Sequence, residues 1–380
     1  MARTITGRDP ASGLPLAVTV ADGMIAAIGE GPSDAEDWLG PGLIDLQVNG
    51  FAGHDLNAPG LLPETVKALA HVLRANGVTT FLPTLITASE SSIGAALRAI
   101  ARARESDPDL AHSIPCVHVE GPHISPEDGP RGAHPREHVR PPDLAEFHRW
   151  QEASGGLVGM VTLSPHHPEA PDYIRALTGE GVHVAIGHTH AGPEEIRAAV
   201  DAGAALSTHL GNGVAATLPR HPNLIWAQLA DDRLTASFIA DGHHLPADAF
   251  RAMLRAKGLE RAVLVSDTAA LGGLPPGTYR QPIGGDVELR EDGRLGIAGT
   301  PYLAGAARPL IEDIPIAMRM GDLSLADALR LATVNPGRFV GGRARIEVGA
   351  SADLIRFAWE PGATRLRVKE LVLRGVTATS

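Results

Sequence analysis

The chain has 380 residues, of which 44% are apolar and 20% charged, a composition typical of a globular protein with a large core. Its formal net charge of -11 argues against nucleic acid or an anionic membrane as the main partner. The single cysteine, Cys116, excludes an intrachain disulfide, and no uninterrupted apolar run approaches membrane-spanning length. Because the N-terminus shows no apolar signal segment, we expect a cytoplasmic protein.

The two ends of the chain share a pattern of short strands. Residues 1–40 contain β-like runs broken by Gly, Asp and Pro, and the tail from residue 344 reads the same way. We predict that residues 1–40 and 344–380 form one small β-sandwich-like module. Residues 41–343 would then form the main domain.

The main domain contains eight apolar runs with strand character. In chain order they are LIDLQV, VTTFLPTL, IPCVHV, GMVTLS, VHVAIG, AALST, TASFIA and AVLVS. Helical patterns separate them, including residues 63–77, 193–203 and 245–258, each with a start signal and a terminal Gly. Eight βα units predict an α/β fold, a (β/α)8 TIM barrel.

Polar side chains follow most of these strands. The C-terminal strand ends of such a barrel carry its chemistry. In chain order these positions hold Gln47 and Asn49, Glu120, His166 and His167, His188, His209, Asp241 with His243 and His244, and Asp267.

Three of these residues form a candidate metal site. A carboxylate at a buried strand end, such as Glu120, is costly unless it is paired or bound to a metal. Together with His188 and His209 it matches a catalytic zinc set that leaves one position open. Each residue alone is more often a hydrogen-bonded structural residue, but three at corresponding strand ends favour a metal. Zinc is the expected ion, with iron(II) and manganese(II) as alternatives.

Asp267 is the candidate general base at the end of the eighth strand. A carboxylate beside the metal can take a proton from the attacking water and return it to the leaving group. The alternative is that Asp267 caps the segment that follows it.

Seven stretches in this order resemble the amidohydrolase superfamily, and within it the N-acetylglucosamine-6-phosphate deacetylase family. They are PGLIDLQVNG, HVEGPHISP, RGAHP, GHTHA, THLGNGV, ADGHHL and VSDTA, and the resemblance covers nearly the whole chain. Many superfamily members carry His-x-His on the first strand and bind two metals. Gln47 and Asn49 stand there instead, so the resemblance implies one divalent ion per chain.

The resemblance also implies roles for individual residues. Glu120, His188 and His209 would hold the metal, Asp267 would be the acid and base, and His134 would polarise the acetyl carbonyl. The remaining assignments, on the substrate side, are Gln47, Asn212, Gly213, His244 and Arg220. Arg220 would reach the phosphate from a neighbouring subunit, which implies a homodimer.

The reaction expected from these features is removal of the acetyl group from an amino sugar, N-acetylglucosamine 6-phosphate, a small-molecule substrate. The departures from the family pattern, HLGNGV and LAGAA, lie on the substrate side. They leave open an amidohydrolase that acts on another N-acyl or cyclic amide lacking phosphate. A catalytically dead scaffold is a further alternative, but it need not keep the metal ligands and Asp267 together. His166, His167 and His243 are interpreted as polar rim residues.

Overall fold

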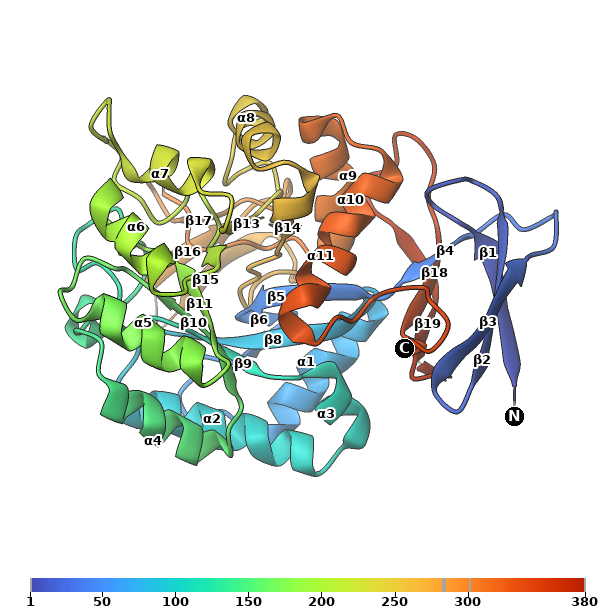
Figure 1. The fold of residues 1–380 in the computed structure, drawn as a ribbon, viewed down its shortest axis with the longest axis horizontal. Helices are drawn as coiled ribbons and strands as arrows, with labels where there is room; N and C mark the ends of the chain where they lie inside the picture. Colours follow the sequence, from blue (N-terminus) through green and yellow to red (C-terminus); the bar gives the residue numbers. More distant parts are fainter. Residues whose placement is uncertain (1, 282–284, 301, 379–380) are drawn as a thin grey trace.

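The computed structural model describes residues 2–281, 285–300 and 302–378. Eight parallel strands follow one another around a ring (Figure 1), and an isolated parallel bridge between Val48 of the first strand and Thr268, just beyond the last, closes it. All eight coincide with the predicted runs, which confirms the barrel. They are β5 (Leu43–Val48), β8 (Val78–Ile86), β9 (Val117–Glu120), β10 (Val158–Leu163), β11 (His183–Ile186), β12 (Leu206–Ser207), β13 (Thr235–Phe238) and β14 (Ala262–Leu264).

Helices cover the outside of the ring, and several begin at a residue that caps the exposed backbone N–H groups. Ser89, Asp107 and Asp143 accept such hydrogen bonds at the starts of α2, α3 and α4. None of the helices in the described part of the chain combines the length and apolar character needed to span a bilayer. The helices are α1 (Pro63–Ala75), α2 (Glu90–Glu105), α3 (Pro108–Ser113), α4 (Leu144–Ser154), α5 (Ala170–Gly179), α6 (Pro193–Asp201), α7 (Leu224–Ala230), α8 (Ala247–Lys257), α9 (Leu310–Gly321), α10 (Leu325–Leu331) and α11 (Val334–Gly337), with the short 3-10 turns η1 (Arg136–His138), η2 (Leu259–Arg261) and η3 (Arg338–Val340).

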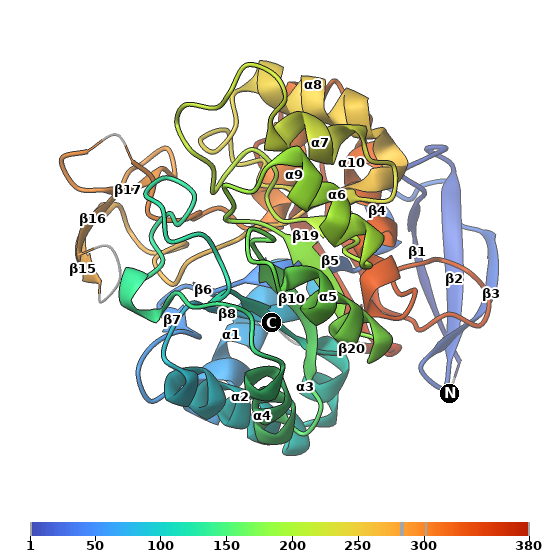
Figure 2. The ribbon, with the colours of Figure 1, turned by 60° about the vertical axis from the view of Figure 1, so that its left-hand side comes forward.

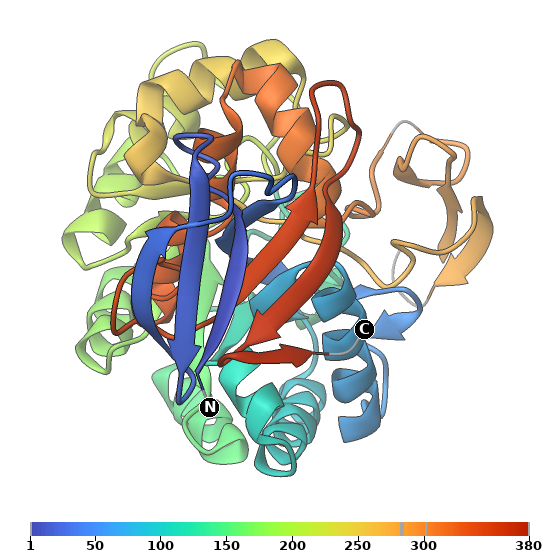
Figure 3. The same ribbon diagram turned by 90° about the vertical axis from the view of Figure 1, so that its right-hand side faces the viewer.

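The strands of the two terminal segments pair into one seven-stranded sheet beside the barrel (Figure 3). β18 pairs antiparallel with β4, so the two ends of the chain meet inside this sheet. A separate apolar cluster that includes Val18, Leu39 and Leu354 packs within it. The division at residues 40 and 344 stays a prediction. The strands, in spatial order, are β20 (Val376–Ala378), β19 (Arg367–Leu373), β18 (Leu354–Ala358), β4 (Trp38–Pro41), β1 (Arg3–Arg8), β2 (Pro15–Ala21) and β3 (Met24–Glu30).

Two carboxylates link this terminal sheet to α3 of the barrel. Asp353 lies 2.8 Å from His112 Nε2, and its side chain is 3% exposed. Asp109 lies 2.9 Å from Arg374 in a pair whose side chains are about half exposed. The contact between the terminal sheet and α3, called the joint below, therefore contains one buried and one half-exposed polar pair.

A three-stranded insert follows β14 and was not predicted from the sequence. It consists of β15 (Gly277–Gln281), β16 (Gly285–Leu289) and β17 (Leu295–Ile297), paired antiparallel. It lies at the opposite end of the molecule from the terminal sheet (Figure 2). Leu271, Val287 and Leu295 form a small apolar cluster of its own. A second unpredicted hairpin, β6 (Gly50–Phe51) with β7 (His54–Asp55), follows β5.

Candidate active site

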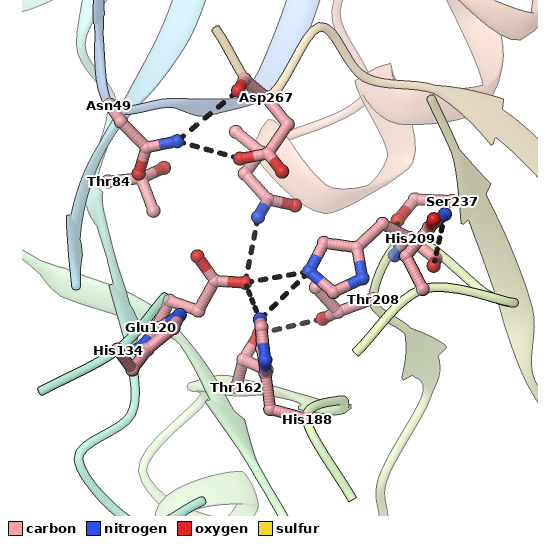
Figure 4. A network of polar contacts seen from close by, with 12 residues as sticks. Asn49, Thr84, Glu120, His134, Thr162, His188, Thr208, His209, Ser237 and Asp267 are labelled. Carbon is pink, nitrogen blue, oxygen red and sulfur yellow. Dashed lines mark hydrogen bonds and ion pairs between the residues drawn. The ribbon is translucent and has the colours of Figure 1, made fainter. Parts of the chain in front are cut away.

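Three side chains converge at the strand ends of the barrel (Figure 4). Glu120 Oε1 lies 3.0 Å from His209 Nε2 and 3.2 Å from His188 Nε2. The two imidazole nitrogens are 3.1 Å apart. All three side chains are less than 10% exposed. The sequence prediction that strands three, five and six bring these residues together is confirmed, because they lie at or directly beyond β9, β11 and β12.

Neighbouring groups orient two of the three side chains. The Nδ1–H of His188 donates to the Pro130 carbonyl at 2.8 Å, which leaves a lone pair on Nε2. Gln47 donates its amide N–H to Glu120 Oε1 at 2.9 Å. His209 Nδ1 is buried and has no hydrogen-bond partner among the described residues.

The spacing of these atoms fits a divalent cation. Ligand atoms about 2.0–2.2 Å from a tetrahedral zinc ion lie about 3.3–3.6 Å from one another. The three separations of 3.0, 3.1 and 3.2 Å lie just below the lower end of that range, so a small outward movement of the side chains admits the ion. One oxygen and two imidazole nitrogens are also acceptable donors for iron(II) and manganese(II).

The three groups also interact electrostatically. Burial raises the pKa of Glu120, but the neighbouring imidazoles of His188 and His209 outweigh this effect and hold the pKa well below its ordinary value. Burial lowers the pKa of His209, but its hydrogen bond to Glu120 outweighs this effect and the pKa is raised. The carboxylate therefore stays ionised, as a metal ligand must.

Asp267 lies directly beyond β14, and Asn49 holds its carboxylate in place. The Nδ2–H of Asn49 donates to Asp267 Oδ1 at 2.7 Å (Figure 4). Burial, followed by the charge of Glu120, raises the pKa of Asp267 to about 6. A carboxyl group with a pKa near neutrality can both accept and return a proton.

Three of these residues have a strained backbone. His188, His209 and Asp267 have φ angles of 47°, 31° and 49°, in the left-handed region that side chains rarely adopt. Such a conformation costs on the order of 1–3 kcal/mol and persists where the surroundings impose it. Hydrogen bonds to the strand ends do so here: the N–H of His209 donates to Ser237 Oγ at 2.7 Å, and that of Asp267 to the Gln47 carbonyl at 3.0 Å.

His134 lies beside the same position. One potential ligand atom each of Glu120, His134 and His188 lie within 4.8 Å of one another. His134 Nδ1 is 2.8 Å from Thr87 Oγ1. Burial, followed by the charge of His188, lowers the pKa of His134 to about 3, so its imidazole is neutral. Because the triangle of Glu120, His188 and His209 is tighter, we retain His209 as the third ligand.

A cavity of about 760 Å3 opens above these residues. Asn212, Gly213 and His244 line it, together with the five polar residues described above, Glu120, His134, His188, His209 and Asp267. His244 Nδ1 lies 2.8 Å from Asp241 Oδ2, which fixes its ring. Gly213 has a φ of 59°, and a Cβ there would lie 2.9 Å from His188 Nδ1. Only glycine therefore lets the backbone approach the His188 ring this closely.

Other predicted site residues lie elsewhere. Gln47 is 1% exposed and contacts Glu120, and it is not among the described residues that line the cavity. Its role as a substrate contact therefore stays a prediction. Arg220 lies exposed on the loop between β12 and α7 and is likewise outside the described lining of its own chain's cavity.

The three histidines interpreted as rim residues are also outside the described lining. The His166 ring lies 3.9 Å from that of His167 and 4.4 Å from that of His190. His243 donates from Nε2 to the Asp292 carbonyl at 2.9 Å. His166 and His167 follow β10, and His243 follows β13.

The amidohydrolase family model matches residues 38–377, which include the whole of the barrel and, of the seven strands of the terminal sheet, β4, β18, β19 and most of β20. This chain belongs to the amidohydrolase family. The match confirms the family inferred from the seven motifs.

Relatives of this amidohydrolase include the N-acetylglucosamine-6-phosphate deacetylase of Bacillus subtilis (strain 168), which is 32% identical over 84% of this chain and 81% of that protein. The N-acetylgalactosamine-6-phosphate deacetylase of Escherichia coli O157:H7 is 34% identical over 85% and 84%. The crystal structure of N-acetyl-D-glucosamine-6-phosphate deacetylase from Mycobacterium smegmatis matches with a TM-score of 0.88, 30% identity and full coverage of both chains. An Asp-to-Ala mutant of that enzyme, in complex with N-acetyl-D-glucosamine-6-phosphate, gives a TM-score of 0.86 over 99% of this chain and 98% of that one.

The sequence analysis missed several groups that shape the amidohydrolase site. Asn49 was noted only as a replacement for histidine, although an amide two residues after Gln47 on the same strand end could have been paired with Asp267. Thr87 and the Pro130 carbonyl orient His134 and His188, and no local pattern marks either of them. The walls supplied by the insert were missed because its strands were not predicted.

Proposed function

We propose that this amidohydrolase removes the acetyl group of N-acetylglucosamine 6-phosphate, giving glucosamine 6-phosphate and acetate. The observation that carries the proposal is the convergence of Glu120, His188 and His209 beside Asp267 at the base of one cavity. The relatives at 32% and 34% identity are named as deacetylases of N-acetylglucosamine 6-phosphate and N-acetylgalactosamine 6-phosphate, respectively. N-acetylgalactosamine 6-phosphate is therefore the second candidate substrate.

Glu120, His188 and His209 would hold one divalent ion, which we propose to be zinc. A bound zinc ion supplies Lewis acidity at a carbonyl oxygen and lowers the pKa of water. Asp267, fixed by Asn49, takes the proton of the attacking water and returns it to the amine nitrogen as the C–N bond breaks. The neutral His134 donates from its second ring nitrogen to the acyl oxygen as negative charge develops there, provided that its Nδ1 accepts from Thr87.

The sugar phosphate is assigned to the side of the cavity that follows β12 and β13. Asn212, the Gly213 backbone and His244 lie there, and Asp241 holds the His244 ring in place through its Nδ1. A polar site of this kind discriminates against a substrate that lacks its anion.

The phosphate assignment is tested by comparing kcat/KM for N-acetylglucosamine 6-phosphate and for the unphosphorylated sugar, with both galactose epimers alongside. We expect the phosphorylated sugar to be hydrolysed at least a hundredfold more efficiently. Equal efficiency on both would overturn the phosphate site and favour an unphosphorylated amide substrate.

We further propose that the chain is a homodimer in which Arg220 of each chain reaches the phosphate in the other chain's cavity. Its exposed position on a rim loop, outside the described lining of its own cavity, supports this. Arg220→Ala and Asp267→Asn homodimers should each be nearly inactive. After subunit exchange half of the dimers are hybrids with one intact site, so roughly a quarter of wild-type activity should return. Confirmed exchange with no recovery would refute the shared site, and Arg197→Ala, an exposed arginine on α6, serves as the matched control.

The cytoplasm is the proposed compartment. A single, largely buried cysteine, Cys116, supports a reducing environment, because it has no partner within the chain. The net charge of -11 supports a small-molecule substrate over nucleic acid or a membrane surface.

A further inference from the structure

A tyrosine that follows β17 of the insert lies on the wall of the cavity. Among the described residues that line this cavity, Tyr302 is the only Phe, Tyr or Trp. It is 69% exposed, and none of the hydrogen bonds among the described residues involves its side chain. The wall therefore carries one large aromatic ring with an uncovered face.

Hydrogen bonds fix the backbone that carries this ring. The Tyr302 carbonyl accepts the N–H of Ile297 at 3.0 Å, and the Tyr302 N–H donates to Thr300 Oγ1 at 3.2 Å. Two residues further on, the N–H of Ala304 donates to the Leu295 carbonyl at 3.0 Å. Because this backbone is already held in place, a ligand that contacts the ring has little further ordering to impose on it.

The segment from Tyr302 onward leads directly to the proposed base. Residues 302–305 all line the cavity. The next residue, Ala306, forms a parallel bridge with Thr268, which directly follows Asp267. Since an extended chain advances at most about 3.6 Å per residue, Tyr302 lies no farther than about 14 Å from this bridge along the wall.

The hexose of the proposed substrate lies along the same wall. Its nitrogen is placed beside Asp267, beyond β14. Its phosphate is assigned to Asn212, Gly213 and His244, which follow β12 and β13. Because β12, β13 and β14 are consecutive in the ring, the sugar spans adjacent arcs of the rim, next to the segment that carries Tyr302.

We propose that Tyr302 is a substrate-binding residue that stacks on the C–H face of the hexose ring. One face of a pyranose consists largely of C–H groups, which pack favourably on the negative face of an aromatic ring. The inference rests on the proposed function, because Asp267 and the phosphate residues place the sugar. The contact is made with a part of the substrate that does not react, so it is equally strong in the bound substrate and in the transition state. Its loss should therefore raise KM and leave kcat unchanged.

Steady-state kinetics on N-acetylglucosamine 6-phosphate test the contact. Tyr302→Ala should raise KM by about tenfold with kcat unchanged, whereas Tyr302→Phe, which keeps the ring, should retain the wild-type KM. Glu291→Ala, an exposed residue of the same insert outside the described lining, is the control and should change neither constant.

The possible failures of this test are distinguishable. An unchanged KM in Tyr302→Ala would overturn the role of Tyr302 and leave the proposed function standing. A KM raised equally in Tyr302→Phe would assign the contact to the hydroxyl group and contradict stacking. No turnover by the wild-type enzyme would overturn both proposals.

A pair of competitive inhibitors shows whether Tyr302 contacts the sugar ring itself. Glucosamine 6-phosphate has the pyranose face, and the open-chain glucosaminitol 6-phosphate keeps the amine and the phosphate but lacks that face. In the wild type the ring form should bind more tightly, and Tyr302→Ala should reduce the ratio of the two inhibition constants by about tenfold. The same ratio in both enzymes would mean that Tyr302 does not contact the ring face, which would contradict the proposal.

Discussion

The barrel rim has two parts that differ in how they are held. Glu120, His188, His209 and Asp267 lie at or directly beyond paired strands, and the strand ends fix even their unfavourable backbone angles. The walls of the cavity come instead from loops, the start of α2 and the insert. On the proposed function, the hydrolytic chemistry lies at the ends of the sheet, and substrate selection lies in segments that can vary without disturbing it.

The two parts also differ in their contacts. Glu120 and His209 are buried and hydrogen-bonded to residues of other strands of the barrel, whereas the cavity walls farther out include apolar side chains such as Leu61. Changes at the first part should affect rate and metal content, and changes at the second should affect the choice of substrate. The following predictions test whether the two parts of the rim have these separate roles. They are given in order of decreasing expected effect.

Replacing the proposed base should have the largest effect. Asp267→Asn keeps the hydrogen-bonding shape but loses proton transfer, so kcat should fall by about 10²- to 10⁴-fold. Metal content should stay at the wild-type level, measured by elemental analysis of the same samples. Asp248→Asn, an exposed carboxylate on α8, is the control. A variant that retained more than a tenth of its activity would remove Asp267 from the mechanism.

Removing a proposed metal ligand should lower the affinity of the enzyme for its metal ion. His188→Ala deletes one corner of the triangle, so affinity for zinc should fall by at least about a hundredfold. Competition with a chelator of known affinity measures it. His148→Ala, whose side chain is 53% exposed on α4, should bind metal like the wild type. Unchanged affinity in His188→Ala would point to His134 as the ligand in its place.

Removing the group that positions the base should have an intermediate effect. Asn49→Ala deletes the 2.7 Å hydrogen bond to Asp267, so kcat should fall about tenfold while KM and metal content change little. Steady-state kinetics with metal analysis check this. A change in KM alone would instead place Asn49 among the substrate contacts.

Substitutions where the terminal sheet contacts α3 of the barrel should lower the stability of the protein without changing kcat. Burial raises the pKa of Asp353, but its hydrogen bonds from His112, the Arg374 N–H and Ser351 outweigh this and hold the pKa below its ordinary value. A depressed carboxyl pKa contributes stability above the ordinary pKa near 4, which is lost as pH falls toward the folded pKa. Asp353→Asn should therefore lower the free energy of unfolding by about 1–3 kcal/mol at pH 7 and by less as pH falls below 4.

The exposed pair at the same joint supplies the comparison. Asp109→Asn breaks the half-exposed contact with Arg374, and its effect on the free energy of unfolding should stay below about 1 kcal/mol. Urea unfolding of both variants between pH 7 and pH 3.5 measures the difference. Equal losses in the two variants would contradict the role given to burial.

The sequence predicted the first part of the rim far better than the second. Strand periodicity located all eight barrel strands, and the residue at each strand end followed directly from them, so Glu120, His188 and His209 could be placed together. The insert was missed because its strands are short and lie among Gly and Pro residues after Asp267. Its contacts with the cavity depend on long-range packing, which no local pattern records.

The hydrogen-bond partners of the site residues were the other feature that the sequence could not predict. The sequence placed Gln47 and Asn49 on one strand end, but only the folded chain shows that one amide bonds Glu120 and the other Asp267. Successive positions of a strand point to opposite faces, and positions two apart share a face, which explains why both amides enter the site. Which carboxylate each one reaches depends on the register of β5 against its neighbours.

The most direct test of the account is a metal titration followed by activity. Gln47 and Asn49 provide no imidazole pair for a second ion, so the triangle should bind one. Metal-free enzyme is titrated with zinc while the initial rate on N-acetylglucosamine 6-phosphate is measured. We expect the rate to rise linearly and to reach its plateau at about one ion per chain. A plateau at two tightly bound ions per chain, or full activity in the metal-free enzyme, would contradict it.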